Sequence, residues 1–422
     1  MKQIILNASN RISSQLLFFL LGSLFILSAC EKNDNDDIRK ASGPPVIERV
    51  RLTDPTTKDS SLSQTTLGST IAIMGKNLAS AQKVVFNGYA LNVNPAYATD
   101  NVLIIRVHDS IPTIATNPNV PDELKVINPA GEATYKFKIL PPRPEVEQIS
   151  NEMAKPGESI TLYGKYFYFV DTVFFPGGNY VTSGITTNGT SLTVQVPEGV
   201  DLSTGDVAVR SQSGMSAVNR RSKFFNPNRS FMLLDWDATN SLGGILNFGW
   251  GLDAGNKVSD SYAGFTPIDG KYAVIEQDVP GNWGWNNDKV INMNNWDGAT
   301  NNGTLLPAPG GTNFAANTPL SSLDLKLEVS SLRPVGELLV QVWQSDYSVN
   351  VPLKNFVKSA DGKWYTVTVN LGDLVKDGNK LATYGDLSKQ NELRVLLQNG
   401  TTAAIPTKLA IDNIRIVNNV RG

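Results

Sequence analysis

The sequence predicts an all-β protein in which two small tandem sandwiches precede a larger one. Three observations lead to this prediction: an internal repeat, many short apolar strand patterns separated by glycine turns, and a C-terminal part that holds every tryptophan. Strands alternate with a period of two, whereas amphipathic helices repeat every 3.6 residues, and no long segment here has the helical period. We therefore expect each domain to consist of sheets packed face to face.

The internal repeat aligns residues 67–76 with residues 156–165. Each segment contains a glycine, an alternating apolar strand, and a second glycine followed by lysine. The first glycines, Gly68 and Gly157, lie 89 residues apart. We interpret these glycines as turn residues with positive φ, a conformation that other residues adopt only at an energetic cost. The repeat predicts two sandwiches of about 90 residues each.

The repeated motif, Gly-x-x-Ile-x-Ile/Leu-x-Gly-Lys followed by Val-x-Phe-x-Gly, resembles that of IPT/TIG immunoglobulin-like domains. The resemblance implies one such domain over 46–140 and another over 144–226. Proline-rich joints at 140–144 and 226–228 are predicted to be semi-rigid, so that the two domains form a stalk. Because such domains serve many roles, this part of the chain indicates little about activity.

The C-terminal domain, 230–422, contains all seven tryptophans. Its length and its strand patterns predict a β-sandwich of the jelly-roll type. The predicted strands lie at 337–343, 364–371, 393–397 and 409–416. Its first and last strands resemble the paired end strands of carbohydrate-binding jelly rolls.

One segment of this domain, 281–298, does not have the pattern of a core strand. Trp283, Trp285 and Trp296 lie there, and eight asparagines occur between positions 282 and 302. We expect an exposed loop in which Trp283 and Trp285 present one flat face if the backbone is extended. An indole offers an apolar surface to the C–H face of a pyranose, and amides offer hydrogen bonds to its hydroxyls.

Alternation assigns the other aromatic residues to faces. In a strand predicted over 338–347, Trp343 shares one face with Gln341 and Tyr347. Trp250 is expected in the core, the core is favoured for Trp236, and Trp364 is left open between an outward position and one beneath a loop. The candidate glycan-binding residues are therefore Trp283, Trp285, Trp296, Trp343, Tyr347, Gln341, Asn286 and Asn287.

The N-terminal residues predict export and a lipid anchor. Leu16 to Ala29 is an apolar run that is too short to span a bilayer, and it has the proportions of a signal peptide. Leu27-Ser28-Ala29-Cys30 resembles the lipobox of bacterial lipoproteins, which implies a signal peptide over 1–29, a lipidated Cys30 and a flexible tether over 30–45. The acidic stretch 31–37 resembles the signal that places Bacteroidetes lipoproteins on the outer surface. The predicted location is the outer membrane, facing outwards.

Composition excludes several classes of function. The formal net charge is −2 and no basic block occurs, which argues against nucleic acid as a partner. Cys30 is the single cysteine and His108 the single histidine, so we expect no disulfide, no cysteine metal site and no mechanism that needs two histidines. No cofactor or metal is expected. A structural calcium ion bound by Asp235 or Asp412 stays an alternative, although the sequence has no segment with the spacing of a calcium-binding loop.

Together these features resemble the surface glycan-binding lipoproteins of Bacteroidetes polysaccharide-utilisation systems, namely the second binding protein encoded beside a TonB-dependent transporter and a SusD-like lipoprotein. The resemblance implies capture of a polysaccharide without chemistry. The expected ligand is a β-linked plant glucan such as mixed-linkage glucan or xyloglucan.

Three alternatives stay open at this point. The tryptophans would serve equally in an adhesin or assembly lipoprotein that binds a protein, or they would plug the ends of the sandwich. A glycoside hydrolase would need two carboxylates about 5–10 Å apart, and the candidates near the tryptophans are Asp288, Asp297 and Asp346.

Overall fold

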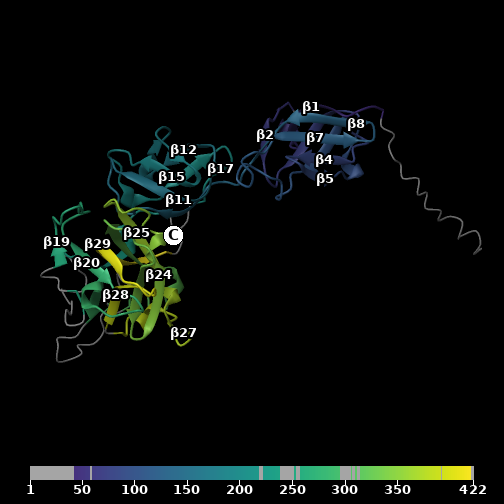
Figure 1. The fold of residues 1–422 in the computed structure, drawn as a ribbon. Helices are drawn as coiled ribbons and strands as arrows, with labels where there is room; N and C mark the ends of the chain where they lie inside the picture. Colours follow the sequence, from purple (N-terminus) through teal and green to yellow (C-terminus); the bar gives the residue numbers. More distant parts are fainter. Residues whose placement is uncertain are drawn as a thin grey trace, which may run out of the picture. The chain divides into compact units, whose positions relative to one another are not determined.

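The computed structural model describes residues 42–57, 59–217, 222–237, 251–252, 257–294, 306, 309–310, 314–390 and 392–419. Within these ranges the regular elements are strands and three-residue 3-10 helices (Figure 1), and the one α-helix is the short α3 (Tyr384–Leu387). The predicted all-β class is therefore confirmed. Cys30, Trp250, Trp296 and Asp297 lie outside the described residues. In the described part, no helix has the length and apolar character needed to cross a membrane.

The chain divides after Leu140 into two compact units. The first is a sandwich with sheets of strand order β1-β3-β6 and β5-β4-β7-β8, and with a parallel pair, β2-β9. Buried residues such as Ile71, Ile73 and Phe86 fill its core. The strands are β1 (Val46–Leu52), β2 (Gln64–Thr66), β3 (Thr70–Lys76), β4 (Lys83–Phe86), β5 (Tyr89–Asn92), β6 (Val102–Arg106), β7 (Glu123–Asn128), β8 (Gly131–Lys136) and β9 (Lys138–Leu140).

The second unit begins with a further sandwich, whose sheets have the orders β10-β11-β15-β14 and β13-β12-β16-β17. Leu162, Phe167 and Val194 are among its buried core residues. The strands are β10 (Glu145–Ile149), β11 (Ser159–Phe167), β12 (Val170–Phe174), β13 (Tyr180–Val181), β14 (Thr186–Thr187), β15 (Gly189–Gln195), β16 (Ala208–Ser211) and β17 (Gly214–Met215).

The repeated glycines have two different physical reasons. Gly68 and Gly157 have φ of +78° and +86°, as predicted for turns that favour glycine. Gly75 and Gly164 lie inside strands, beside a bulge in the strand alongside. A Cβ atom there would lie 1.8 Å and 1.9 Å from a backbone carbonyl oxygen of that strand. Close approach of two backbones, and not positive φ, explains this second pair.

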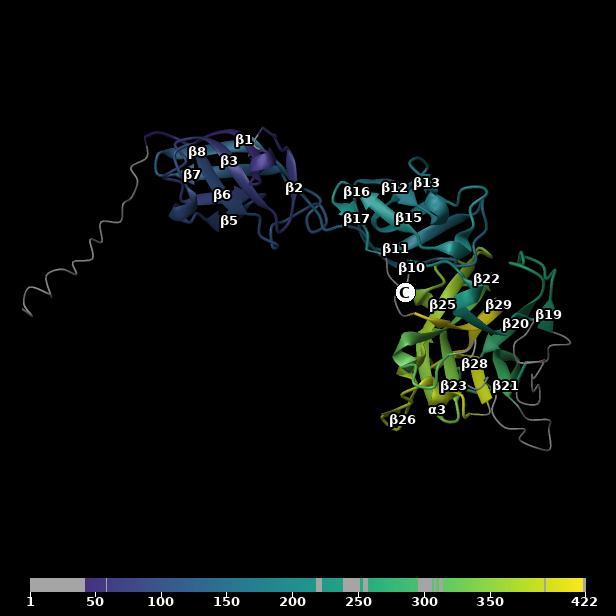
Figure 2. The ribbon, with the colours of Figure 1, turned by 180° about the vertical axis from the view of Figure 1, so that it is seen from behind.

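The C-terminal domain is a sandwich of two sheets, seen from both sides in Figures 1 and 2. The β29 sheet has the order β19-β20-β29-β22-β25, with β18 also paired to β29. The β28 sheet has the order β21-β28-β23-β24-β26-β27. The strands are β18 (Ser230–Leu234), β19 (Val258–Ser259), β20 (Tyr272–Val279), β21 (Val290–Asn294), β22 (Leu323–Ser331), β23 (Leu339–Gln344), β24 (Tyr347–Pro352), β25 (Trp364–Asn370), β26 (Val375–Lys376), β27 (Asn379–Lys380), β28 (Glu392–Gln398) and β29 (Ile405–Asn418).

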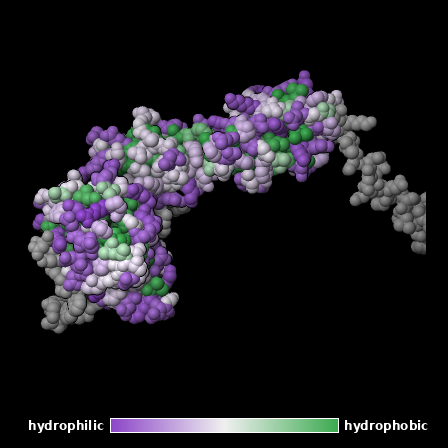
Figure 3. Space-filling view, in the orientation of Figure 1, coloured by the Kyte–Doolittle hydropathy of each residue, from purple (hydrophilic) through white to green (hydrophobic). Residues whose placement is uncertain are grey.

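Alternate residues of both sheets meet in one apolar core between them. Leu325 and Leu327 of the β29 sheet and Val340 and Val342 of the β28 sheet belong to this core and are fully buried. Each sheet therefore has an inner face toward the core and an outer face. On the molecular face drawn in Figure 3, hydrophobic residues form small patches separated by hydrophilic ones.

The second sandwich packs on the outer face of the β29 sheet. The backbone N–H of Thr366 donates to the carbonyl oxygen of Ser150 (2.8 Å), and the Thr366 hydroxyl accepts from the N–H of Glu152 (2.8 Å). Met153 packs against an aromatic cluster that contains Trp364. The second sandwich and the C-terminal domain are therefore in direct contact beside the joint at 226–228. The sequence predicted a stalk but not this interface.

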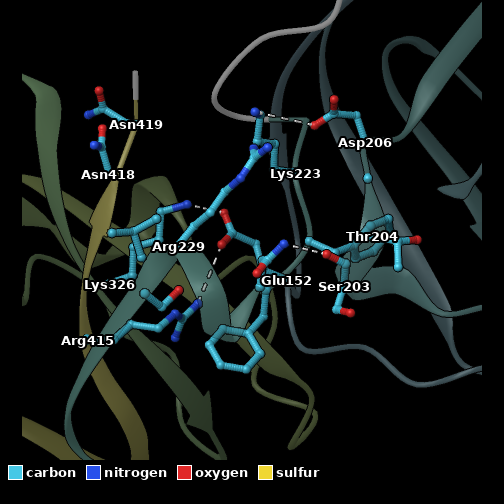
Figure 4. A pocket seen from close by; sticks show the side chains of 16 residues that line it. Glu152, Ser203, Thr204, Asp206, Lys223, Arg229, Lys326, Arg415, Asn418 and Asn419 are labelled. Carbon is cyan, nitrogen blue, oxygen red and sulfur yellow. Dashed lines mark hydrogen bonds and ion pairs between the residues drawn. The ribbon is translucent and has the colours of Figure 1, made fainter. Parts of the chain in front are cut away.

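Four charged side chains, Arg415, Glu328, Glu152 and Lys326, lie buried in this interface. Three of them, Arg415, Glu152 and Lys326, line a cavity of about 130 Å³ (Figure 4). Arg415 holds Glu328 with both guanidinium ends, at 2.5 Å and 2.9 Å. Glu152 of the second sandwich pairs with Lys326 at 2.5 Å and with Arg415 at 3.4 Å. The charges balance, which buried ions require because each is costly to remove from water.

Candidate functional site

Two half-exposed indoles stand on the loop that joins β20 to β21. Trp283 is 50% exposed and Trp285 is 48% exposed. Backbone hydrogen bonds tie the loop to the segment after β28: Asn282 N donates to Thr401 O (2.7 Å) and Trp283 N donates to Asn399 O (2.9 Å). Rigid aromatic side chains that are already exposed lose little conformational entropy when a ligand covers them.

The loop is not extended at Asn282 and Trp283, so the condition under which Trp283 and Trp285 were expected to present one flat face is not met. Asn282 and Trp283 have φ of +52° and +61°, in the left-handed region. The rings of Trp283 and Trp285 are held in place by different neighbours. The Trp283 ring lies over Gly400, and the indole N–H of Trp285 donates to Asn287 Oδ1 (2.7 Å).

Asn286 and Asn287 support the loop through their side chains. The Asn286 amide donates to Gln277 Oε1, and its oxygen accepts from the backbone N–H of Asp288 (2.8 Å). Both ends of this amide are therefore used within the protein. Asn287 is exposed, and its oxygen holds Trp285. Asn286 thus supports the fold of the loop, while its contact with a glycan stays a prediction.

The outer face of the β28 sheet carries Trp343 and Gln341. Their neighbours on β23, Val340 and Val342, point into the core. The guanidinium of Arg394, on β28, lies 4.3 Å from the centre of the Trp343 ring, a cation–π contact. Trp343 is thus held in place on a surface that is part polar and part aromatic.

Tyr347 lies on the opposite face from Trp343, contrary to the prediction. Ser345 and Asp346 both have positive φ, so the chain reverses there in a two-residue hairpin turn. The register pairs Tyr347 with Gln344 and places it against the apolar core. The alternation of side chains along β23 ends at this turn, and Tyr347 therefore does not belong to the outer face.

Residues 225–418 match the family model described as the surface glycan-binding protein B xyloglucan binding domain. The C-terminal domain belongs to this family. We call residues 225–418 the SGBP-B domain.

Two solved structures and one curated sequence are similar to the chain. Surface glycan-binding protein PbSGBP-B from Prevotella bryantii has a TM-score of 0.58 at 22% identity, covering 90% of this chain and 100% of that one. SGBP-B from a complex xyloglucan utilization locus in Bacteroides uniformis has a TM-score of 0.45 at 20% identity, covering 89% and 99%. An IPT/TIG domain-containing protein from Bacteroides ovatus is 31% identical over 161 residues, 37% of this chain and 32% of that protein. The chain thus spans about a third of that relative's length.

Two other tryptophans of the SGBP-B domain are buried. Trp236 belongs to the apolar core and is 8% exposed. Trp364 lies in the aromatic cluster outside the β29 sheet, and its indole N–H donates to the carbonyl oxygen of Thr266 (2.6 Å). Both have structural roles. For Trp364, which the sequence left open, the second sandwich supplies part of the cover through Met153.

Two of the three candidate carboxylates, Asp288 and Asp346, lie in the described part of the SGBP-B domain, and each has a lysine partner. Asp288 lies 3.8 Å from Lys257, and Asp346 lies 2.9 Å from Lys376. Burial raises the pKa of Asp412 to about 9. Asp412 is fully buried on β29, whereas Trp343 lies on the β28 sheet, so this carboxyl group is not part of the indole-bearing surface. Among the described residues, no group of three or more His, Cys, Asp or Glu side chains is arranged to hold a metal ion.

Three further residues shape this surface and were not predicted from the sequence: Arg394, Gln398 and Gly400. Arg394 alternates with the apolar Leu393 and Val395 and pairs with Glu392 two residues earlier (2.8 Å), a pattern that indicates an outward position. Gln398 Nε2 donates to Gln341 Oε1 (3.2 Å), a contact between strands far apart in sequence. Gly400 had no local signal, because its neighbour, Trp283, comes from another loop.

Gly400→Ala is expected to weaken ligand binding about threefold to tenfold while leaving stability within about 1 kcal/mol. A Cβ atom at Gly400 would lie 2.9 Å from Cζ2 of Trp283, so the indole must move. Isothermal titration calorimetry gives the affinity and a thermal melt gives the stability. The control is Gly205→Ala in the second sandwich, where the nearest atom to a new Cβ is 3.4 Å away. Equal affinities of the two variants would contradict the expectation.

Proposed function

We propose that the SGBP-B domain binds a β-linked plant glucan without cleaving it, with xyloglucan as the first candidate and mixed-linkage glucan as the second. The observation that carries this proposal is the pair of half-exposed indoles, Trp283 and Trp285, on a loop fixed by backbone hydrogen bonds. The description of the matching family, a xyloglucan binding domain, supports the choice of the first candidate.

The chemistry of this surface suits a neutral polysaccharide. Pyranose rings stack on indoles, while the amide of Gln341 and the aromatic–cationic pair of Trp343 and Arg394 offer polar contacts beside them. We expect dissociation constants on the order of micromolar to millimolar, or about −8 to −4 kcal/mol, because a few stacked rings and exposed hydrogen bonds contribute modestly.

The same geometry supports binding over hydrolysis. Asp288 and Asp346 each already have a lysine partner, at 3.8 Å and 2.9 Å, whereas a glycosidase needs two carboxylates that face one sugar ring. We therefore propose that the protein holds its glycan and passes it on unchanged.

We further propose that the protein is anchored in the outer membrane through a lipid on Cys30 and faces outwards. The lipobox-like residues at 27–30 and the acidic stretch that follows support this location. A TonB-dependent transporter and a SusD-like lipoprotein are the proposed partners, since a captured glycan must then be handed over for uptake.

The test is affinity electrophoresis of residues 31–422 in native gels cast with xyloglucan, mixed-linkage glucan, xylan, mannan, starch or chitosan. Retardation by xyloglucan or mixed-linkage glucan is expected, with unchanged chain length of the glycan after overnight incubation. Retardation by none of the six would overturn glycan binding and favour a protein partner, and shortening of the glycan would show an enzyme.

A further inference from the structure

A fully buried lysine lies between the Trp283–Trp285 loop and the β28 sheet. Lys289 ends the short 3-10 turn Asn287–Lys289 and is 0% exposed. Its ammonium donates to the carbonyl oxygen of Gly284 (2.6 Å) and to Gln398 Oε1 (3.0 Å). Within the described ranges it forms no ion pair, and burial lowers the pKa of Lys289. A buried cation held only by neutral oxygens is costly, which points to a role beyond stability.

The ammonium determines how the next two amides are oriented. A lysine ammonium has only donors, so the amide oxygen of Gln398 must face it. The amide nitrogen of Gln398 then faces Gln341 and donates to Gln341 Oε1 (3.2 Å). The oxygen of Gln341 is thereby used inside the protein, and its NH₂ group is the end left for a ligand.

We propose that Lys289 is a positioning residue that, through Gln398, makes Gln341 present a hydrogen-bond donor to the bound glycan. The inference rests on the proposed function. The NH₂ group of Gln341 lies on the same face as Trp343 and suits an acceptor oxygen of the sugar, a hydroxyl or an ether oxygen. Lys289 also holds Gly284, between Trp283 and Trp285, so it couples the indole loop to the sheet.

The sharpest test is Gln398→Glu. A carboxylate at this position still accepts from Lys289, and the new ion pair preserves or raises the melting temperature. The carboxylate has no donor, so the Gln341 amide turns its NH₂ group inward and presents its oxygen to the glycan. The dissociation constant for a xyloglucan oligosaccharide is expected to rise about tenfold. The matched control, Gln212→Glu, changes an exposed glutamine of the second sandwich in the same way and is expected to bind as the wild type.

A double-mutant cycle tests the coupling. Lys289→Met and Gln341→Ala should each raise the dissociation constant about tenfold. Because Lys289 acts through Gln341, the double variant should also have a dissociation constant raised about tenfold, and not about a hundredfold. Additive effects would mean that the two residues act independently. If Lys289→Met does not fold, Gln398→Glu decides alone.

The outcomes separate this inference from the proposed function. If the wild type binds no glucan, the proposed function fails first. If the wild type binds xyloglucan and Gln398→Glu binds it equally well, the role of Lys289 is refuted while glucan binding stands. Reduced affinity of Gln398→Glu with an unchanged melting temperature supports the inference.

Discussion

Replacing Trp283 and Trp285 together with alanine is expected to abolish retardation by xyloglucan in native gels. Each indole leaves about half of its surface in water in the free protein, and stacking on a sugar ring would cover it. Aromatic anchors at the centre of a binding surface typically contribute about 2 kcal/mol or more, about thirtyfold in the dissociation constant. Calorimetry with xyloglucan oligosaccharides gives the loss for each single variant.

The control for this experiment is Tyr180→Ala. Tyr180 is the aromatic side chain of the second sandwich that is 62% exposed, so its loss removes a comparable exposed ring away from the loop. Wild-type retardation is expected for this variant, and the double tryptophan variant should melt within a few degrees of the wild type. Retention of glucan binding by the double variant would place the site elsewhere in the protein.

Arg415→Met is expected to destabilise residues 141–422 by about 3–5 kcal/mol, which lowers the melting temperature by roughly 10 °C. The variant leaves Glu328 fully buried without its bidentate partner, and Glu152 keeps only Lys326. An uncompensated buried charge is costly, because the protein interior solvates an ion far less well than water does. Differential scanning calorimetry measures the change.

Two further variants show whether the cause is the unpaired charge. Arg210→Met removes a surface pair in which both side chains are about half exposed, and it should cost at most about 1 kcal/mol. Arg415→Met combined with Glu328→Leu removes both charges and should recover part of the loss. If Arg415→Met melts no lower than Arg210→Met, the buried cluster does not stabilise the interface.

The glycines of the repeat show how far local pattern carried the prediction. Gly68 and Gly157 were interpretable from sequence because a tight turn with positive φ is a property of a few consecutive residues. Gly75 and Gly164 repeat just as clearly, yet their reason is a carbonyl oxygen from a neighbouring strand. The repeat therefore predicted the sandwiches, while the steric reason for half of its glycines needed the strand pairing.

The candidate site shows the same division. The concentration of tryptophan and asparagine after residue 280 predicted an exposed aromatic loop, and Trp283 and Trp285 are exposed. Alternation placed Trp343 on the outer face of its strand, where the structure has it, with Arg394 against its ring. It misplaced Tyr347, because the two-residue turn at 345–346 resets which side chains share a face.

By itself, the sequence determined the all-β class, the repeat and the part of the chain that carries the exposed tryptophans, since alternation, turn residues and composition act over short stretches. Only the tertiary structure decided that Trp364 is covered, that Arg415 neutralises Glu328, and that Lys289 reaches Gln398. These depend on strands and loops that are more than 80 residues apart along the chain. Burial and hydrogen-bond partners arise from that pairing, which no local pattern encodes.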